Sequence, residues 1–174
     1  FSKSELNIYE YPSDSELKNY PIKSIFLGYF EKWDSIRNYE VAKKNGFKEY
    51  SAGLEGCHFN FEKLDNYQHG IHDYFKFLKF GFARSTDQLS YLVRRGLIPR
   101  NEAIKIAEEK EGNFPRSYLG KTLEDILKKI GLTVDDFDII CDKFTNKKIF
   151  KCNQSGELIK DNHKNLKKIS YDNI

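Results

Sequence analysis

A single apolar, β-favouring run, Ile22–Phe30, is the feature that most constrains how this chain can fold. It reads IKSIFLGYF, which has the length and composition of a buried strand. A lone strand leaves its backbone N–H and C=O groups unpaired, so it needs a neighbouring strand. We expect that neighbour to be chain outside these 174 residues, with a hairpin near the C-terminus or a second copy of the chain as the alternatives.

Most of the remaining sequence has the apolar period, the capping residues and the glycine stops of helices. Helices are predicted over 33–46, about 66–79, 85–96, 99–112, 117–131 and 133–144. Ser85 with Gln88 and Thr133 with Asp136 have the spacing of capping boxes. Residues 1–21 are expected to be irregular, residues 47–65 to form a packed loop, and residues around 153–156 to turn a short hairpin.

The predicted fold class is therefore mostly α, with one or two short strands. A chain of 174 residues with 39% hydrophobic and 15% aromatic residues can close one core. We predict one portion over 1–160 and a polar, frayed tail over 161–174. A net charge of +3 is too small to indicate a nucleic-acid partner. No apolar run reaches the ~20 residues of a membrane span, and three irregularly spaced cysteines favour a reducing, cytoplasmic setting.

The stretch FLKFGFARSTDQLSYLVRRG, residues 77–96, surrounds core aromatics with cations. Lys79 and Arg84 flank the Phe-Gly-Phe turn, and Asp87 follows. An arginine fork suits phosphate because it donates two parallel hydrogen bonds. The alternative interpretation is that these are surface cations and that Asp87 favours a helix N-terminus. The same interpretation explains the Arg94–Arg95 pair at the end of that helix.

Two stretches, SIFLGYFEKWDSIRNYEVAKKNGF and DYFKFLKFGFARSTDQLSYLVRRGLIPRNEAI, resemble the N-acetyl sugar amidotransferases of the PP-loop ATP pyrophosphatase superfamily. The likeness covers about residues 10–160. It implies that this chain is the C-terminal part of an α/β fold of the adenine-nucleotide alpha-hydrolase-like (HUP) type, whose sheet would pair with the expected strand. The family's Ser-Gly-Gly-x-Asp-Ser phosphate loop is absent from the sequence, so this chain alone is expected to be inactive.

The resemblance also implies a reaction. With ATP and Mg²⁺, these bacterial enzymes activate the amide oxygen of a sugar N-acetyl group, and ammonia displaces it to give an acetamidino group. Glutaminase and ammonia-channel subunits supply the ammonia. The expected substrate is a sugar nucleotide for lipopolysaccharide O-antigen or for flagellar glycans such as pseudaminic or legionaminic acid. No nucleic acid or membrane partner is expected, and a homodimer is possible.

Lys79, Arg84 and Asp87 match the family's Lys-Phe-Gly-Phe-x-Arg-x-x-Asp run. The resemblance implies that they bind ATP, pyrophosphate or the substrate, with Asp87 orienting Arg84 or assisting a metal. Arg100 joins them as a candidate because it stands at a helix start, where a cation is disfavoured. Trp33 and Asp34 follow the expected strand and offer a sugar a stacking face and a hydroxyl acceptor; the alternative is a core tryptophan beside a helix N-cap.

His72 is a weak candidate for a proton carrier, because the pKa of histidine is close to neutrality. Cys57, His58 and His69 lie nearby, and zinc would need four such ligands. The adjacent Cys-His pair suits one ion poorly, so we assign no metal.

Two other functions fit the sequence. Another PP-loop ATP pyrophosphatase, such as a tRNA-modifying enzyme, predicts salt-sensitive RNA binding. A non-catalytic helical docking or dimerisation module predicts a large exposed aromatic patch and no affinity for nucleotides.

Overall fold

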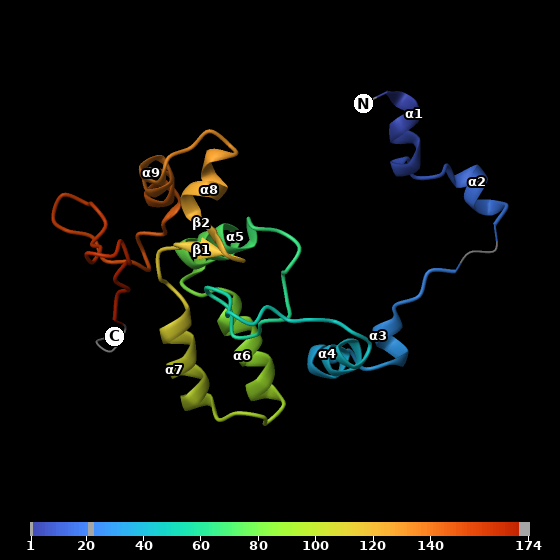
Figure 1. Ribbon diagram of the computed structural model, residues 1–174, viewed down its shortest axis with the longest axis horizontal. Coiled ribbons are helices and arrows are strands. Elements are labelled where there is room, and N and C mark those ends of the chain that lie inside the picture. The colour runs from blue at the N-terminus through green and yellow to red at the C-terminus, as the bar shows by residue number, and fades with distance from the viewer. Residues whose placement is uncertain (1, 21–22, 171–174) are drawn as a thin grey trace. The chain divides into compact units, whose positions relative to one another are not determined.

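The structure is a computed structural model that describes residues 2–20 and 23–170 (Figure 1). It divides into two compact units, residues 1–45 and residues 46–174. The expected division was at residue 160. We describe each unit by itself.

The first unit contains short helices and no buried residue among those described. They are α1 (Lys3–Leu6), the 3₁₀ helix η1 (Asn7–Tyr9), α2 (Asp14–Lys18), α3 (Leu27–Phe30) and α4 (Ser35–Lys44). The irregular start expected here is instead partly helical, because Ser2 and Ser13 each close a capping box with a glutamate three residues on. The helix predicted over 33–46 is confirmed as α4, with Asp34 as its N-cap.

The strand predicted over Ile22–Phe30 is wrong. Residue 22 lies outside the described residues, residues 23–26 have no regular secondary structure, and Leu27–Phe30 is a helical turn. Phe26 is 90% exposed and Tyr29 is 87% exposed. A strand of this composition forms where its backbone is paired and its side chains are covered, and the described part of this unit supplies neither condition.

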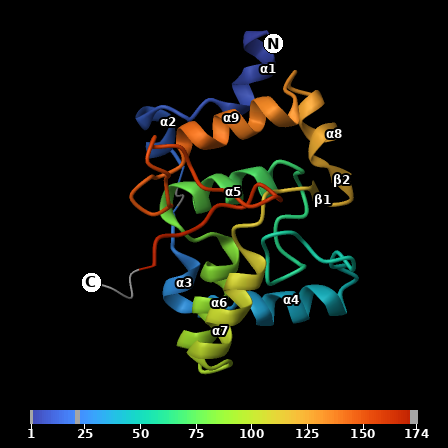
Figure 2. The ribbon, with the colours of Figure 1, turned by 90° about the vertical axis from the view of Figure 1, so that its left-hand side faces the viewer.

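The second unit confirms a mostly α fold. Its elements are α5 (His69–Phe80), α6 (Arg84–Arg94), α7 (Arg100–Lys110), β1 (Ser117–Tyr118), β2 (Lys121–Thr122), α8 (Leu123–Lys128) and α9 (Val134–Phe144). Helix α5 lies in the middle of this unit, with α9 on one side and the α6–α7 pair on the other (Figures 1 and 2). The loop over residues 47–65 packs as expected, with Leu54 and Cys57 buried.

A small sheet stands where the start of a helix was predicted at residue 117. Strands β1 and β2 are antiparallel, and Tyr118 pairs with Lys121. Leu119 and Gly120 both have positive φ, 49° and 74°, as in the tight turns that join twisted strands. These two residues prevent a helix until Thr122, whose side chain caps α8 by accepting a hydrogen bond from the Asp125 N–H at 3.1 Å.

The core of this unit is aromatic, and α5 supplies its centre. Phe77 lies 5.3 Å from the ring of Phe150 and Tyr74 lies 5.8 Å from Phe114, measured between ring centroids. Each buried aromatic side chain contributes roughly 1.5–3 kcal/mol to folding. Gly81 ends α5 with φ of 76°, and this left-handed cap turns the chain sharply into α6.

The C-terminal segment, residues 147–170, packs against this core. The hairpin expected around residues 153–156 is confirmed by an antiparallel bridge between Cys152 and Leu158. Residues 161–170 are not the solvated tail that was expected: Leu166 packs against the core, and Lys164 pairs with Asp138 at 3.1 Å. Alternating apolar residues and acids on α9 hold this segment in place. Residues 171–174 lie outside the described residues.

Candidate functional site

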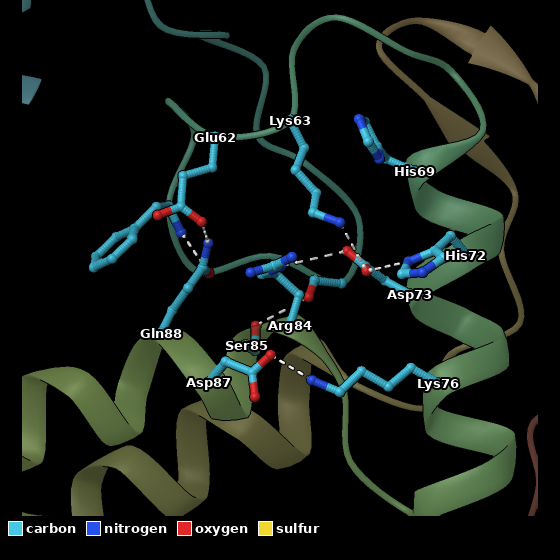
Figure 3. A network of polar contacts seen from close by, with 12 residues as sticks. Glu62, Lys63, His69, His72, Asp73, Lys76, Arg84, Ser85, Asp87 and Gln88 are labelled. Carbon is cyan, nitrogen blue, oxygen red and sulfur yellow. Dashed lines mark hydrogen bonds and ion pairs between the residues drawn. The ribbon is translucent and has the colours of Figure 1, made fainter. Parts of the chain in front are cut away.

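A buried carboxylate, Asp73 of α5, is the centre of a polar cluster with α6 and the preceding loop (Figure 3). Asp73 is 5% exposed. Its Oδ1 atom lies 3.2 Å from Lys63 Nζ and 3.0 Å from His72 Nδ1. Its Oδ2 atom lies 3.7 Å from Arg84 Nε. One carboxylate therefore holds two cations and a histidine in place.

Two atoms of this cluster have no hydrogen-bond partner. Asp73 Oδ2 and Arg84 Nε are both buried, and the 3.7 Å between them exceeds hydrogen-bonding distance. A buried polar atom left unpaired costs about 1–3 kcal/mol. Such atoms are rare in folded proteins and call for an explanation in terms of a bound group.

Asp87 is held by Lys76 of α5 through a short ion pair. Lys76 Nζ also lies 4.9 Å from the centre of the Phe82 ring. The interpretation of Asp87 as the residue that orients Arg84 therefore has a rival in the structure, because Asp73 stands beside Arg84 instead.

The capping box predicted for Ser85 and Gln88 is wrong. The N-cap of α6 is Ala83, and it forms no side-chain cap. Ser85 Oγ donates to the Gly56 carbonyl at 3.2 Å. Gln88 Oε1 accepts from the backbone N–H groups of His58 at 2.7 Å and Phe59 at 3.1 Å. Both side chains are drawn outwards by loop backbone that needs partners, so they fasten the loop to α6.

The other predicted site residues lie apart from this cluster. Lys79 is exposed, with Nζ 5.1 Å from the centre of the Phe144 ring. Arg100 is exposed at the first position of α7. Trp33 and Asp34 belong to the first unit; Trp33 is 74% exposed, and Asp34 accepts hydrogen bonds from two backbone N–H groups of α4. The structure thus brings together Arg84, Asp87 and His72 of the predicted set.

Two cavities adjoin this cluster. The α5 cavity, about 400 Å³, is lined by residues 52–56, by α5 residues that include Asp73, and by residues 109–116. The α6–α7 cavity, about 770 Å³, is lined by both of those helices and by the C-terminal segment. Both volumes are in the range of small-molecule sites.

The cysteine and histidine side chains beside the cluster are explained by packing. Burial, with the negative charge of Asp73, raises the pKa of Cys57 to about 11, which keeps it a thiol at neutral pH. Burial and the charge of Lys110 lower the pKa of His58. His69 Nε2 lies 3.1 Å from Asp65. These contacts favour structural roles for the three residues.

Sequence reasoning missed Asp73, Lys63, Lys76 and Gln88. The signal for Asp73 was its spacing: it stands four residues before Phe77 and next to Tyr74, on the buried face of a helix. A carboxylate in that place is seldom buried without a partner. Lys63 carries no such signal, because a loop brings it to the cluster.

The second unit is thus a helical domain with a buried ionic cluster between two cavities. Residues 30–167 match the family described as LPS biosynthesis protein WbpG-like, C-terminal domain, and the chain belongs to this family. That membership places it in lipopolysaccharide biosynthesis. No curated protein matches the chain. Among the residues described, no helix is both long and apolar enough to cross a membrane.

Proposed function

We propose that this chain is the C-terminal part of an ATP-dependent N-acetyl sugar amidotransferase of lipopolysaccharide biosynthesis. In this proposal the whole enzyme has a PP-loop, HUP-type sheet, works in the cytoplasm, and converts the N-acetyl group of a sugar nucleotide to an acetamidino group. ATP and Mg²⁺ bind mainly to sequence outside this chain, because the phosphate loop is absent from these 174 residues. Glutaminase and channel subunits deliver the ammonia.

One observation carries the proposal beyond the family membership. Arg84, the arginine of the FGFAR run, stands beside a buried carboxylate that anchors its side chain, and its Nε is unpaired. An arginine held in this way is preorganised, so it would stabilise negative charge that develops on the substrate without first having to reorganise. Lys79 lies outside the cluster, so the proposal assigns the principal role to Arg84.

The test is amidination by the full-length protein with Arg84→Ala. We expect a loss of about 10²-fold or more in kcat/KM, as for removal of a charged transition-state contact. Arg95→Ala is the matched control, because Arg95 follows the same helix but lies over the Tyr91 ring at 4.6 Å, measured to its centroid. Activity of Arg84→Ala within about twofold of wild type would refute this role.

A second candidate, a docking or dimerisation module, is favoured by the first unit. Six of its large apolar side chains are each at least 67% exposed: Ile25, Phe26, Leu27, Tyr29, Phe30 and Trp33. Exposed apolar surface of this kind marks interaction sites. Sedimentation of the chain at micromolar concentration tests self-association, and calorimetry with nucleotides separates the two functions, since a docking module has no affinity for them.

A further inference from the structure

We infer that the two cavities form one site for a sugar nucleotide, with the glycosyl ring in the α5 cavity and the diphosphate in the α6–α7 cavity. The inference rests on the proposed function for the identity of the substrate, and it adds where each part of that substrate binds.

The α5 cavity has the chemistry of a sugar subsite. Four acids, Glu55, Asp73, Glu109 and Glu111, line it against two cations, Lys110 and Arg116, so it disfavours phosphate. The same wall contains the aromatic residues Tyr74, Phe77 and Phe114. Carboxylates accept hydrogen bonds from hydroxyl groups, and aromatic rings cover the apolar C–H face of a sugar ring. An uncharged, hydroxyl-bearing ring satisfies both.

Asp73 is the residue that would read the sugar. Its Oδ2 is an acceptor without a donor, and Arg84 Nε, 3.7 Å away, is a donor without an acceptor. A hydroxyl group can donate to the first and accept from the second at the same time. A phosphate oxygen can only accept, so Asp73 would repel it. The pair therefore selects a hydroxyl, which reaches it when the side chains around the cavity move slightly apart.

The carboxylates of Glu55 and Glu111 are already occupied. Glu55 Oε1 accepts from the Ser117 N–H at 3.0 Å and from its hydroxyl at 2.7 Å. Glu111 Oε2 accepts from the Thr86 hydroxyl at 2.9 Å, and its other oxygen accepts from the Thr86 N–H. These acids shape the cavity, whereas Asp73 keeps an oxygen for a ligand.

The α6–α7 cavity has the opposite charge character. Three cations line it, Arg94, Arg100 and Lys168, against two acids, Glu108 and Glu111. The Glu111 carboxylate is engaged by Thr86, so the cations prevail at the surface a ligand would meet. Arginine binds phosphate through parallel hydrogen bonds. The apolar side chains between α6 and α7 would accept the nucleoside base.

The two cavities share a wall. Phe77, Glu111, Gly112 and Asn113 line both of them. A ligand with a neutral polar end and an anionic end can therefore occupy both. Among substrates with such ends, a sugar joined to a nucleoside diphosphate fits the order of the chemistry.

Glycine amides of the ¹⁵N-labelled 174-residue chain can report on each cavity separately. Gly53 and Gly56 line the α5 cavity, whereas Gly81 lines the α6–α7 cavity. The probes are N-acetylglucosamine, UDP and UDP-N-acetylglucosamine. We expect the sugar to shift Gly53 and Gly56, UDP to shift Gly81, and the joined ligand to shift all three and to bind at least about tenfold more tightly than UDP.

Variants assign the two subsites. Asp73→Asn should weaken the sugar about tenfold or more and leave UDP unchanged, since it removes the unpaired acceptor. Replacement of both Arg94 and Arg100 by Gln should do the reverse. Asp138→Asn, which removes a carboxylate of α9 that pairs with Lys160, is the matched control and should change neither. If Asp73→Asn unfolds, Ala52→Phe replaces it, because Ala52 lines the α5 cavity at an exposed turn.

The inference is overturned if UDP shifts Gly53 and Gly56, if the sugar shifts neither glycine at tens of millimolar, or if Asp73→Asn and Ala52→Phe bind the sugar as wild type does. A loss of amidination in Arg84→Ala alongside any of these results would leave the proposed function standing and reject the division into subsites. Normal amidination in Arg84→Ala with both subsites mapped would do the opposite.

Discussion

Gln88 fastens the loop of residues 56–63 to α6, and its replacement by leucine should loosen the candidate site. The side chain is 4% exposed. It accepts from the N–H groups of His58 and Phe59 and donates to Glu62 Oε2 at 2.9 Å. Leucine has a similar volume, so little cavity would form, but both N–H groups would lose their acceptor.

Each stranded backbone donor costs about 1–3 kcal/mol. Because the loop is only partly buried, we take the lower part of that range and expect Gln88→Leu to lower the free energy of unfolding by about 2–4 kcal/mol, out of a typical ~5–15 kcal/mol. Urea unfolding measures this loss, and hydrogen exchange at the two amides locates it. Gln68→Leu, at an exposed glutamine, is the control and should change stability by less than about 0.5 kcal/mol.

Gln88→Glu separates the hydrogen bonds from the shape of the side chain. Its carboxylate would keep both N–H donors but face Glu62 at close range. Like charges raise the pKa of a carboxylate, so the destabilisation should be greatest at neutral pH and diminish as the pH falls below about 5. The reasoning fails if Gln88→Leu loses less than about 1 kcal/mol, or if protection at the two amides is unchanged.

Three further predictions concern the second unit. Burial raises the pKa of Asp138, but the hydrogen bonds and charges of the two lysines beside it outweigh burial and lower it; its contribution to stability should therefore persist above pH 3.8 and disappear as the pH falls below that value, and Lys160→Gln should flatten this limb of an acid titration. Gly112→Ala should destabilise the fold by about 1–3 kcal/mol more than Gly131→Ala, because both glycines have positive φ but only at Gly112 does the new Cβ meet a buried aromatic ring, at 2.5 Å; equal melting curves would contradict this. Cys57, 1% exposed with a raised pKa, should resist iodoacetamide in the folded chain and react fully in urea, as mass spectrometry would show.

The helices could be predicted from sequence because their signals are local. The start of α4 at Asp34, the glycine stop at Gly81 and the capping box of Thr133 on α9 each depend on residues within one turn of a helix. The strand failed at Ile22–Phe30 because an apolar run specifies burial only when other chain covers it. The composition of a segment does not report whether such cover exists.

The candidate site could be predicted only in part. Arg84 carried a signal because a cation beside core aromatics is unusual. Its partner Asp73 stands on another helix, and Lys63 is on a loop, so their meeting depends on tertiary packing. The capping box of Ser85 and Gln88 failed for the same reason: loop backbone thirty residues away competes for both side chains.

The last described residues also form part of the wall of the larger cavity. Asn165, Leu166 and Lys168 line it, and Asn165 Oδ1 accepts from the Phe114 N–H at 2.7 Å. An expression design that trims the polypeptide before residue 161 would therefore open this chamber to solvent. Purification handles are safer when they are separated from residue 170 by a flexible spacer.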